Sequence, residues 1–381
     1  MKFFLSAGEP SGDLHGSNLA KALSLLSPGL ELAGFGGPKM AAVGCRLLFP
    51  LVDYAIVGIP KAIQAIPQLL RLLAQAEAFF EKERPDALVM IDYPGFHWWL
   101  AARARRHGIP VIYYVPPQIW AWARWRVRKM RRLVDLTLCN FPFEEKWFSE
   151  NGVNAKLIGH PYYDEILQQK LDLQFLAEQK QQGGIPVGLL PGSRNQEVER
   201  NTPSLIRAAG LIFNKHPSAR FLFACFSQAQ QKKVDAQLAG SGLPVLTFTG
   251  KTPEIISLST VCAAVSGSVS LELLCAEKPS TIMYRASKIG IFLTQLLMAV
   301  PYITLVNLLA RKELYPESFG SGCPAEWIAG HINGWLAKPD TRLTLEKELR
   351  ELKNQVVFPG ASQRGAEEIL RWINPARQIA A

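Results

Sequence analysis

Polar side chains that can transfer protons cluster shortly after the first apolar segment of the chain. Glu9, Ser11, Asp13 and His15 alternate with glycines in a short motif, between the apolar residues 3–5 and a helical apolar pattern. The glycines are Gly8, Gly12 and Gly16. They predict a strand-to-helix turn in which positive φ angles let a ligand approach the backbone. The spacing of these glycines does not match G-x-G-x-x-G, the fingerprint of dinucleotide-binding sites. The motif therefore favours a site for proton transfer or sugar hydroxyls, with a capped turn and solvated acids as the simpler alternative.

Asp92 is the second candidate, because it ends the apolar run 87–91 and precedes a Pro-Gly pair. An acid at the carboxyl end of a central parallel strand points into the ligand crevice of an open α/β sheet. Burial at such a place raises a carboxyl pKa, as a general base requires. A turn-forming aspartate is the alternative.

Two turns of small residues in the second half of the chain predict an anion site. Gly192, Ser193 and Arg194 follow an apolar segment, and their amides and guanidinium suit a diphosphate leaving group. A capped helix with a surface arginine explains this turn equally well. The residues Ser266, Gly267 and Ser268 precede Glu272, an order that fits phosphate-binding amides and a carboxylate for a ribose diol.

Strand-like and helical segments alternate along the chain and would position these residues. Strands are expected at 3–6, 32–35, 87–91, 111–115, 136–139, 155–158, 186–190, 220–225, 246–249, 261–265 and 281–284. A polar link at 168–184 separates the two series. The rhythm predicts two doubly wound, Rossmann-like domains that face a central cleft. We expect an N-terminal domain at 1–170, a second domain at 171–345, and C-terminal helices at 346–381 that pack across both.

Composition limits the class of protein. The chain has 381 residues, 48% of them hydrophobic, and a formal net charge of +10, which favours an anionic partner. Its six cysteines are dispersed without a C-x-x-C pair, and no apolar leader follows Lys2. These features indicate a reducing, cytoplasmic environment and no zinc site.

Three further segments indicate contact with a surface or a polyanion. The uncharged stretch 289–310 is predicted as an interfacial or core segment rather than a membrane span. The stretch 56–73 has apolar residues at helical spacing, which predicts a core helix, with contact with one face of a membrane as the alternative. The basic block 124–132 lies beside Trp120 and Trp122. Its arginines and aromatic residues fit RNA or anionic lipid headgroups, and a solvated helix face remains open.

The chain also resembles the lipid-A-disaccharide synthases. The similar segments run in the family's order and are 6–13, 91–96, 115–122, 142–144, 158–161, 190–194 and 307–311. The resemblance implies an inverting glycosyltransferase of the GT-B type, in which the domain at 1–170 faces the acceptor and the membrane and the domain at 171–345 binds the UDP-sugar. Such enzymes join UDP-2,3-diacylglucosamine to 2,3-diacylglucosamine 1-phosphate (lipid X), forming the β-1,6 disaccharide of lipid A and releasing UDP.

Roles for individual residues follow from the matching motifs. The resemblance assigns Asp92 and Arg194 to catalysis, Glu272 and residues 266–268 to the nucleotide sugar, and Asn307 and Arg311 to a polar motif near the cleft. His97 stands where many members carry an asparagine, and Gly95 replaces their second acid. Glu9, Ser11 or His15 remain alternatives for the base, and Glu9 is included among the catalytic candidates.

The expected chemistry needs no redox cofactor, and no metal motif is present. The expected partners are the two acylated substrates and the inner face of an anionic membrane, not nucleic acid; a homodimer is left open. The expected location is cytoplasmic and peripheral at the inner membrane. Two other functions remain: a transferase or epimerase acting on a soluble UDP-sugar, and an RNA-binding module.

Overall fold

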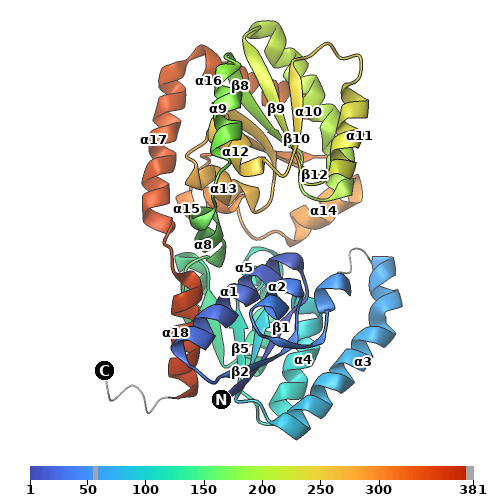
Figure 1. The fold of residues 1–381 in the computed structure, drawn as a ribbon, viewed down its shortest axis with the longest axis vertical. Helices are drawn as coiled ribbons and strands as arrows, with labels where there is room; N and C mark the ends of the chain where they lie inside the picture. Colours follow the sequence, from blue (N-terminus) through green and yellow to red (C-terminus); the bar gives the residue numbers. More distant parts are fainter. Residues whose placement is uncertain (55–58, 375–381) are drawn as a thin grey trace. The chain divides into compact units, whose positions relative to one another are not determined.

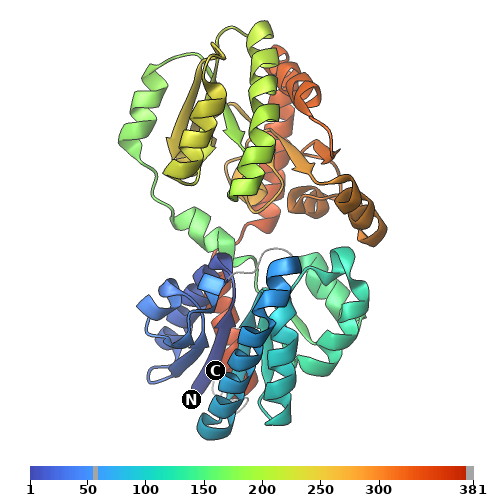
Figure 2. The same cartoon turned by 90° about the vertical axis from the view of Figure 1, so that its right-hand side faces the viewer.

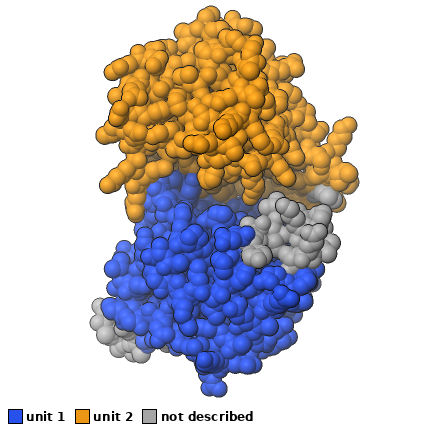
Figure 3. All heavy atoms as spheres, turned by 45° about the vertical axis from the view of Figure 1, so that its right-hand side comes forward, with its two compact units in different colours: residues 1–167, 358–381 blue, residues 168–357 orange. Residues whose placement is uncertain are grey.

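The computed structural model describes residues 1–54 and 59–374, and these form two compact units (Figure 3). Unit 1 contains residues 1–167 together with the chain from 358 onward, and unit 2 contains residues 168–357. Each unit has its own parallel sheet with helices around it (Figure 1).

Unit 1 is built on a seven-stranded parallel sheet of order β3-β2-β1-β4-β5-β6-β7. Its strands are β1 (Lys2–Ala7), β2 (Glu31–Phe35), β3 (Arg46–Phe49), β4 (Ala87–Ile91), β5 (Val111–Tyr114), β6 (Leu136–Cys139) and β7 (Ala155–Leu157). Its helices are α1 (Pro10–Leu26), α2 (Pro38–Ala42), α3 (Ile59–Glu83), α4 (Pro94–Arg106), α5 (Ile119–Trp122), α6 (Val127–Leu133), α7 (Pro142–Glu150), α8 (Pro161–Gln168) and α18 (Ala361–Ile373), with short 3-10 turns η1 (Leu51–Tyr54) and η2 (Arg124–Arg126).

The alternation of side chains along β1 explains how helices cover both faces of this sheet. Phe3 and Leu5 belong to a buried cluster that includes residues of α1 and α18. Phe4 points to the other face, where its ring meets Phe79 and Phe80 of α3 at 5.3 and 5.1 Å between centroids. In Figure 2 the helices α3 and α4 lie in front of the sheet, whereas α18 lies behind it.

Unit 2 is built on a six-stranded parallel sheet of order β10-β9-β8-β11-β12-β13. Its strands are β8 (Ile185–Leu190), β9 (Ala219–Cys225), β10 (Val245–Thr249), β11 (Val261–Val265), β12 (Ser280–Arg285) and β13 (Glu317–Gly320). Its helices are α9 (Leu173–Gln181), α10 (Asn195–Lys215), α11 (Gln228–Leu238), α12 (Thr252–Leu258), α13 (Val269–Cys275), α14 (Lys288–Leu297), α15 (Leu305–Ala310), α16 (Ala325–Ala337) and α17 (Pro339–Val356). A buried cluster of apolar residues from β8, β9, β11, α10 and α16 forms its core.

The predicted class of fold is confirmed, and every strand expected from the sequence is present to within a residue or two. The sequence analysis missed β3 and β13, which are short edge strands of four residues each. The predicted polar link contains α9, whose first turn is capped by Asp172: its carboxylate accepts the N–H of Phe175 at 3.0 Å.

The C-terminal helices, expected at 346–381 to pack across both domains, are divided between the two units. The helix α17 belongs to unit 2, whereas α18 belongs to unit 1 and packs against α1. Asp164 of α8 holds the start of α18, because its carboxylate accepts the backbone N–H groups of Gly360 and Ser362 at 2.6 and 3.1 Å.

The two apolar stretches also have defined structures. The stretch 289–310 is divided into α14 and α15, separated by a segment that contains Pro301. Most of the stretch 56–73 lies in α3; residues 56–58 lie outside the described residues. Among the helices that the structure describes, none combines the length and the apolar character that crossing a bilayer requires.

Candidate active site

In unit 1 the first site residues lie at the point where the strand order reverses. The chain leaves β1 to form β2 and β3 on one side and returns to form β4 on the other side of β1. Ala7 at the end of β1 is in register with Ile91 at the end of β4. The turn that carries Glu9 and the turn that carries Asp92 are therefore neighbours at the position where open α/β sheets bind ligands.

The glycine-rich motif is not a long turn, and this part of the sequence prediction was wrong. Helix α1 begins at Pro10, so Gly12 and Gly16 lie inside it, and neither they nor Gly8 has a positive φ. These glycines instead permit close packing. A Cβ on Gly8 would lie 2.2 Å from the ring of Tyr93, and one on Gly16 would lie 2.8 Å from the sulfur of Met40.

A strained backbone holds Asp92 at the end of β4. Asp92 and Tyr93 both adopt left-handed conformations, with φ of 52° and 50°, which is costly for residues other than glycine. The carbonyl of Asp92 accepts the hydroxyl of Tyr113 at 2.9 Å and Nδ1 of His97 at 2.6 Å. Nδ1 of His97 thus carries the proton, and Nε2 accepts the hydroxyl of Ser6 at 2.9 Å. These contacts fix the turn from three neighbouring elements.

Burial, supported by the negative charge of Glu9, raises the pKa of Asp92 from 3.8 to about 6. Burial and Glu9 also raise the pKa of Tyr93. His97 is neutral at physiological pH because burial lowers its pKa to about 4. Asp92 is thus a carboxylate at neutral pH, with the increased basicity that a general base needs.

The other predicted residues of this motif differ in their surroundings. Glu9 is partly exposed at the N-cap position of α1, and Ser11 is exposed in its first turn. Asp13 is 2% exposed, and its carboxylate accepts the N–H groups of Gly37, Lys39 and Met40 at 2.9 to 3.0 Å. The structure therefore uses Asp13 to hold the loop after β2 rather than to face a ligand.

His15 lies on α1 beside His160 and Tyr162, with ring centroids 6.1 and 6.5 Å away. Burial lowers its pKa to about 4, and its Nδ1 is buried without a hydrogen-bond partner among the described residues. His160 is also neutral: burial lowers its pKa to about 3, and its Nδ1 accepts the N–H of Tyr162 at 3.1 Å. His15 is thus suited to donating or accepting a hydrogen bond, not to carrying charge.

The basic block is anchored by a buried carboxyl. Trp120 donates its indole N–H to Glu144 at 2.9 Å, and Glu144 also accepts the N–H of Asn140 at 2.9 Å. Burial raises the pKa of Glu144 to about 7. Beyond this anchor, Trp125 is exposed, and the guanidinium of Arg126 lies 4.7 Å from the ring centre of the exposed Trp122.

In unit 2 the predicted diphosphate turn lies at the corresponding point of the second sheet. The strand order reverses between β8 and β11, and Leu190 is in register with Ala264. Gly192 has a φ of 111°, and a Cβ there would lie 2.5 Å from a carboxylate oxygen of Glu197. Only glycine fits this turn, because both the conformation and the space exclude a side chain.

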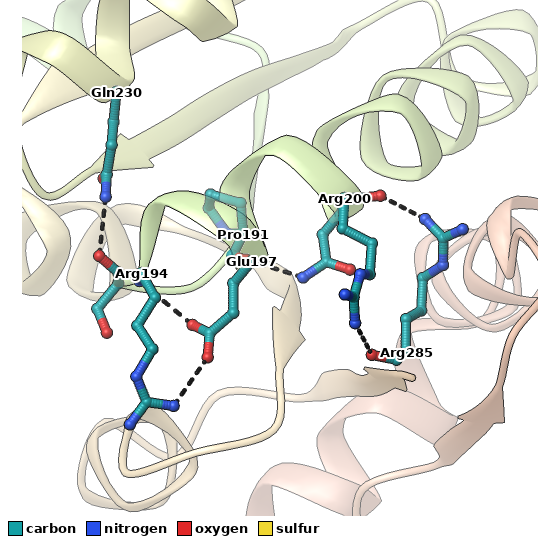
Figure 4. Close-up of polar contacts among 8 residues, drawn as sticks. Pro191, Arg194, Glu197, Arg200, Gln230 and Arg285 are labelled. Carbon is teal, nitrogen blue, oxygen red and sulfur yellow. Dashed lines mark hydrogen bonds and ion pairs between the residues drawn. The ribbon is translucent and has the colours of Figure 1, made fainter. Parts of the chain in front are cut away.

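Exposed polar groups occupy this turn (Figure 4). Arg194 is exposed, and its guanidinium donates to Glu197 at 3.2 Å. Gln230 of α11 supports the turn from behind by donating to the carbonyl of Ser193 at 2.8 Å. Since a surface ion pair of this kind contributes little stability, the guanidinium can exchange Glu197 for an anionic ligand.

The second turn of small residues follows β11, next to the first. Gly267 and Ser268 are exposed, Ser266 is partly exposed, and a Cβ on Gly267 would meet open space. Ser270 supports this turn, because its hydroxyl donates to the carbonyl of Gly267 at 2.9 Å. Glu272 is partly buried one turn further along α13.

Asn307 is buried and its hydrogen bonds are satisfied within unit 2. Its amide donates to Tyr315 and Glu317 at 2.7 and 2.9 Å, and its oxygen accepts the N–H groups of Leu314 and Tyr315, both at 2.9 Å. Asn307 therefore holds the segment between α15 and β13. Arg311, which ends α15 with a left-handed φ of 55°, is exposed.

The sequence analysis missed several residues that shape these turns. Tyr93 packs against Gly8, His97 and Tyr113 fix the carbonyl of Asp92, and Gln230 supports Ser193. His97 could have been found from the sequence, because it is a polar residue only five positions after the candidate base Asp92. No local pattern marks Gln230, which is distant in the sequence. Among the described residues, no group of three acidic, histidine or cysteine side chains could hold a metal ion.

Comparison with known sequences relates the chain to one family over almost its whole length. A family model described as lipid-A-disaccharide synthetase matches residues 3–360. The lipid-A-disaccharide synthase of Myxococcus xanthus is 32% identical over 378 residues, covering 99% of this chain and 98% of the relative. The enzyme of the same name from Geobacter metallireducens is 32% identical over 380 residues, covering 99% and 98%.

Solved structures share the fold at low sequence identity. MnaA of S. aureus in a co-structure with UDP has a TM-score of 0.68 at 11% identity, covering 98% of this chain and 97% of its own. A UDP-GlcNAc 2-epimerase of Neisseria meningitidis bound to UDP-GlcNAc has a TM-score of 0.64 at 12% identity, covering 97% and 100%. Phytolacca americana UGT2, complexed with UDP-2fluoro-glucose and pterostilbene, has a TM-score of 0.64 at 13% identity, covering 98% and 99%. The two Rossmann-like units thus form a GT-B fold.

Proposed function

The chain belongs to the lipid-A-disaccharide synthase family, and we propose that it is the inverting glycosyltransferase of that name. It transfers 2,3-diacylglucosamine from UDP-2,3-diacylglucosamine to the 6-hydroxyl of 2,3-diacylglucosamine 1-phosphate. The products are UDP and the β-1,6 disaccharide 1-phosphate of lipid A. A single displacement at the anomeric carbon accounts for the inversion.

Asp92 is the proposed general base of this reaction. It accepts the proton of the attacking 6-hydroxyl as the new glycosidic bond forms. Its raised pKa and its fixed turn at the strand reversal support this role. Glu9 increases the basicity of Asp92 from the adjacent turn. Ser11 and His15, which share the same helix, are proposed to bind sugar hydroxyls of the acceptor.

The turn 192–194 is the proposed site for the diphosphate of the donor. The backbone N–H groups of Gly192 and Ser193 and the guanidinium of Arg194 stabilise the negative charge that develops on UDP as its bond to the sugar breaks. The turn 266–268 and Glu272 are proposed to bind the remaining nucleotide groups, with Glu272 accepting the ribose hydroxyls. Arg311 is a further candidate for a substrate anion.

The buried residues Asp13 and Asn307 are proposed to support the loops of the site. The carboxylate of Asp13 and the amide of Asn307 already hold backbone groups of their own unit. They position the loops after β2 and α15 rather than touch the substrates.

The acylated substrates imply a peripheral position on the inner face of the cytoplasmic membrane. Exposed apolar residues on α3 and α14, the basic block beside Trp122 and the net charge of +10 support such a position.

One observation carries the proposal: in each sheet, the polar turns suited to acid–base work or anion binding lie at the reversal of strand order, in a chain matched over residues 3–360 by one family. A transferase or epimerase for a soluble UDP-sugar is not favoured, because the relatives of that one family span the whole chain.

Release of UDP from both acylated substrates, dispersed in detergent, tests the proposal. We expect turnover by the native protein and loss of at least about a hundredfold in Asp92→Asn, with UDP binding unchanged. A folded native protein that binds UDP but forms no disaccharide would refute the function. Equal turnover by Asp92→Asn would refute the assigned base.

A further inference from the structure

Tyr93 occupies a position that neither its backbone nor the following helix favours. Its φ of 50° is left-handed, a conformation that costs free energy for a residue with a bulky side chain. It is also the N-cap residue of α4, where Ser, Thr, Asp or Asn would accept a backbone N–H, and its side chain forms no capping hydrogen bond. Residues that break local preferences in this way are expected at functional sites. The turn alone does not explain a tyrosine at this position.

The surrounding fold keeps room for the ring of Tyr93. A Cβ on Gly8 would lie 2.2 Å from this ring, so glycine directly after β1 is what admits it. The rings of His97 and Phe96 approach from α4, with centroids 5.9 and 6.4 Å away. His97 meets the tyrosine edge to face, at 84° between the ring planes. These contacts hold the ring in one orientation at the strand reversal of unit 1.

The hydroxyl of Tyr93 is the group that these contacts leave unused. The side chain is partly exposed, and within residues 1–54 and 59–374 no group forms a hydrogen bond with its oxygen, which is accessible to solvent. The hydroxyl of the neighbouring Tyr113, by contrast, donates to the carbonyl of Asp92 at 2.9 Å. Burial and the negative charge of Glu9 raise the pKa of Tyr93. The phenol is therefore protonated at neutral pH and can donate a hydrogen bond to a ligand.

The proposed acceptor has few groups that such a donor can select. In 2,3-diacylglucosamine 1-phosphate, carbons 2 and 3 carry acyl groups and carbon 1 carries the phosphate, so the free hydroxyls of the sugar are those on carbons 4 and 6. The 6-hydroxyl is the proposed nucleophile and lies at Asp92. Carbon 4 is bonded to carbon 5, which carries carbon 6. The 4-hydroxyl is therefore the nearest other hydroxyl that a residue beside Asp92 can bind.

We propose that Tyr93 binds the 4-hydroxyl of the acceptor sugar by donating its phenolic hydrogen, and so orients the 6-hydroxyl toward Asp92. This inference rests on the proposed function, because it names the residue that recognises the acceptor at the same site. A hydroxyl both donates and accepts, so Ser11 or His15 can bind the hydrogen of the same 4-hydroxyl. Holding the nucleophile in line with its base contributes to the rate. Tyr93 is then a residue of acceptor recognition, and Asp92 remains the base.

A purely structural role of Tyr93 is the competing explanation. In that case the ring fills the space beside Gly8 and holds the turn of Asp92 without touching a substrate. Phenylalanine keeps the ring and removes only the hydroxyl, so Tyr93→Phe separates the two roles. The matched control is Tyr284→Phe, which removes the hydroxyl of another accessible tyrosine, 38% exposed near the end of β12 in unit 2.

Turnover of the acceptor and of its 4-deoxy analogue, both dispersed in detergent, tests the proposal. For the native protein, loss of the 4-hydroxyl should lower kcat/KM about three- to tenfold, as expected for one neutral hydrogen bond. Tyr93→Phe should lower kcat/KM for the natural acceptor by a similar factor but should use the two acceptors equally well, because the partner of the 4-hydroxyl is already lost. Its affinity for UDP should be unchanged. Tyr284→Phe should discriminate between the acceptors as the native protein does.

Two results would overturn this inference. Native turnover by Tyr93→Phe would show that the hydroxyl is not used, and a loss by Tyr93→Phe that adds to the full loss from the 4-deoxy acceptor would show that it acts elsewhere. In both cases the proposed function would stand. Calorimetry of acceptor binding separates the reverse case: a native protein that prefers the natural acceptor over its 4-deoxy analogue, in a way that Tyr93→Phe abolishes, but forms no disaccharide would refute the proposed function and keep the role of Tyr93.

Discussion

The raised pKa of Asp92 predicts that this residue destabilises the folded protein at neutral pH. Its pKa rises from 3.8 to about 6 on folding, so the folded state holds the proton more tightly than the unfolded state. This contribution is fully favourable below about pH 4 and is lost as the pH rises through about 6. Asparagine mimics the protonated carboxyl and also tolerates the left-handed conformation of this residue. Asp92→Asn should therefore remove a cost that exists only at higher pH.

The size of this effect follows from the two pKa values. Since one pKa unit corresponds to about 1.36 kcal/mol, a change from 3.8 to about 6 corresponds to roughly 3 kcal/mol. At pH 8 we expect Asp92→Asn to be more stable than the native protein by up to about 3 kcal/mol, while its turnover is lost. At pH 4 the two proteins should be nearly equal in stability. Such an exchange of stability for activity is characteristic of catalytic residues.

Urea unfolding of both proteins at several values between pH 4 and 8 provides the assay, with turnover measured on the same samples. The midpoint difference should grow with pH and level off above about pH 7. A constant difference at all pH values, or an asparagine variant that is less stable at pH 8, would refute the reasoning. Glu9→Gln is a useful companion, because it should move the acid limb of kcat/KM to lower pH.

Three further changes test the turns at the two strand reversals and the segment that Asn307 holds. Gly8→Ala places a methyl 2.2 Å from the ring of Tyr93 and should reduce kcat at least tenfold, whereas Gly95→Ala, which meets open space, should keep it in the same UDP-release assay. Arg194→Lys would remove the proposed bidentate contact of the guanidinium with the diphosphate and should weaken UDP binding about tenfold by calorimetry; unchanged affinity would count against this site. Asn307→Ala leaves the buried N–H groups of Leu314 and Tyr315 unpaired and should lower the free energy of unfolding by about 2 to 3 kcal/mol. Under conditions in which the variant is fully folded, its affinity for UDP should equal that of the native protein.

The strands and their order of alternation were predictable, because apolar runs such as 87–91 and 261–265 are bounded by turn residues. The edge strands β3 and β13 were not, since they bury little and carry mixed side chains. Local pattern also identified Asp92 and Arg194 as residues that follow strands. It could not show which glycines need a positive φ: Gly192 does, and Gly8 does not.

The function of a polar residue depended on contacts that no local pattern reveals. Asp13 and Asn307 have the same sequence signal as Glu9 and Arg311, namely a polar side chain inside a glycine-rich or family motif. Only the fold shows that the first pair is used by backbone groups, from the loop after β2 for Asp13 and from residues 314 and 315 for Asn307. The same holds for Tyr93, which follows β4 and whose ring packs against Gly8 at the end of the neighbouring strand β1.

The anomeric configuration of the product tests the central claim most directly. The native protein, given UDP-2,3-diacylglucosamine and 2,3-diacylglucosamine 1-phosphate, should form one UDP for each disaccharide. The one-bond carbon–proton coupling at the new anomeric centre should report a β linkage, as a single displacement assisted by Asp92 requires. An α linkage, or UDP released without any disaccharide, would contradict this account.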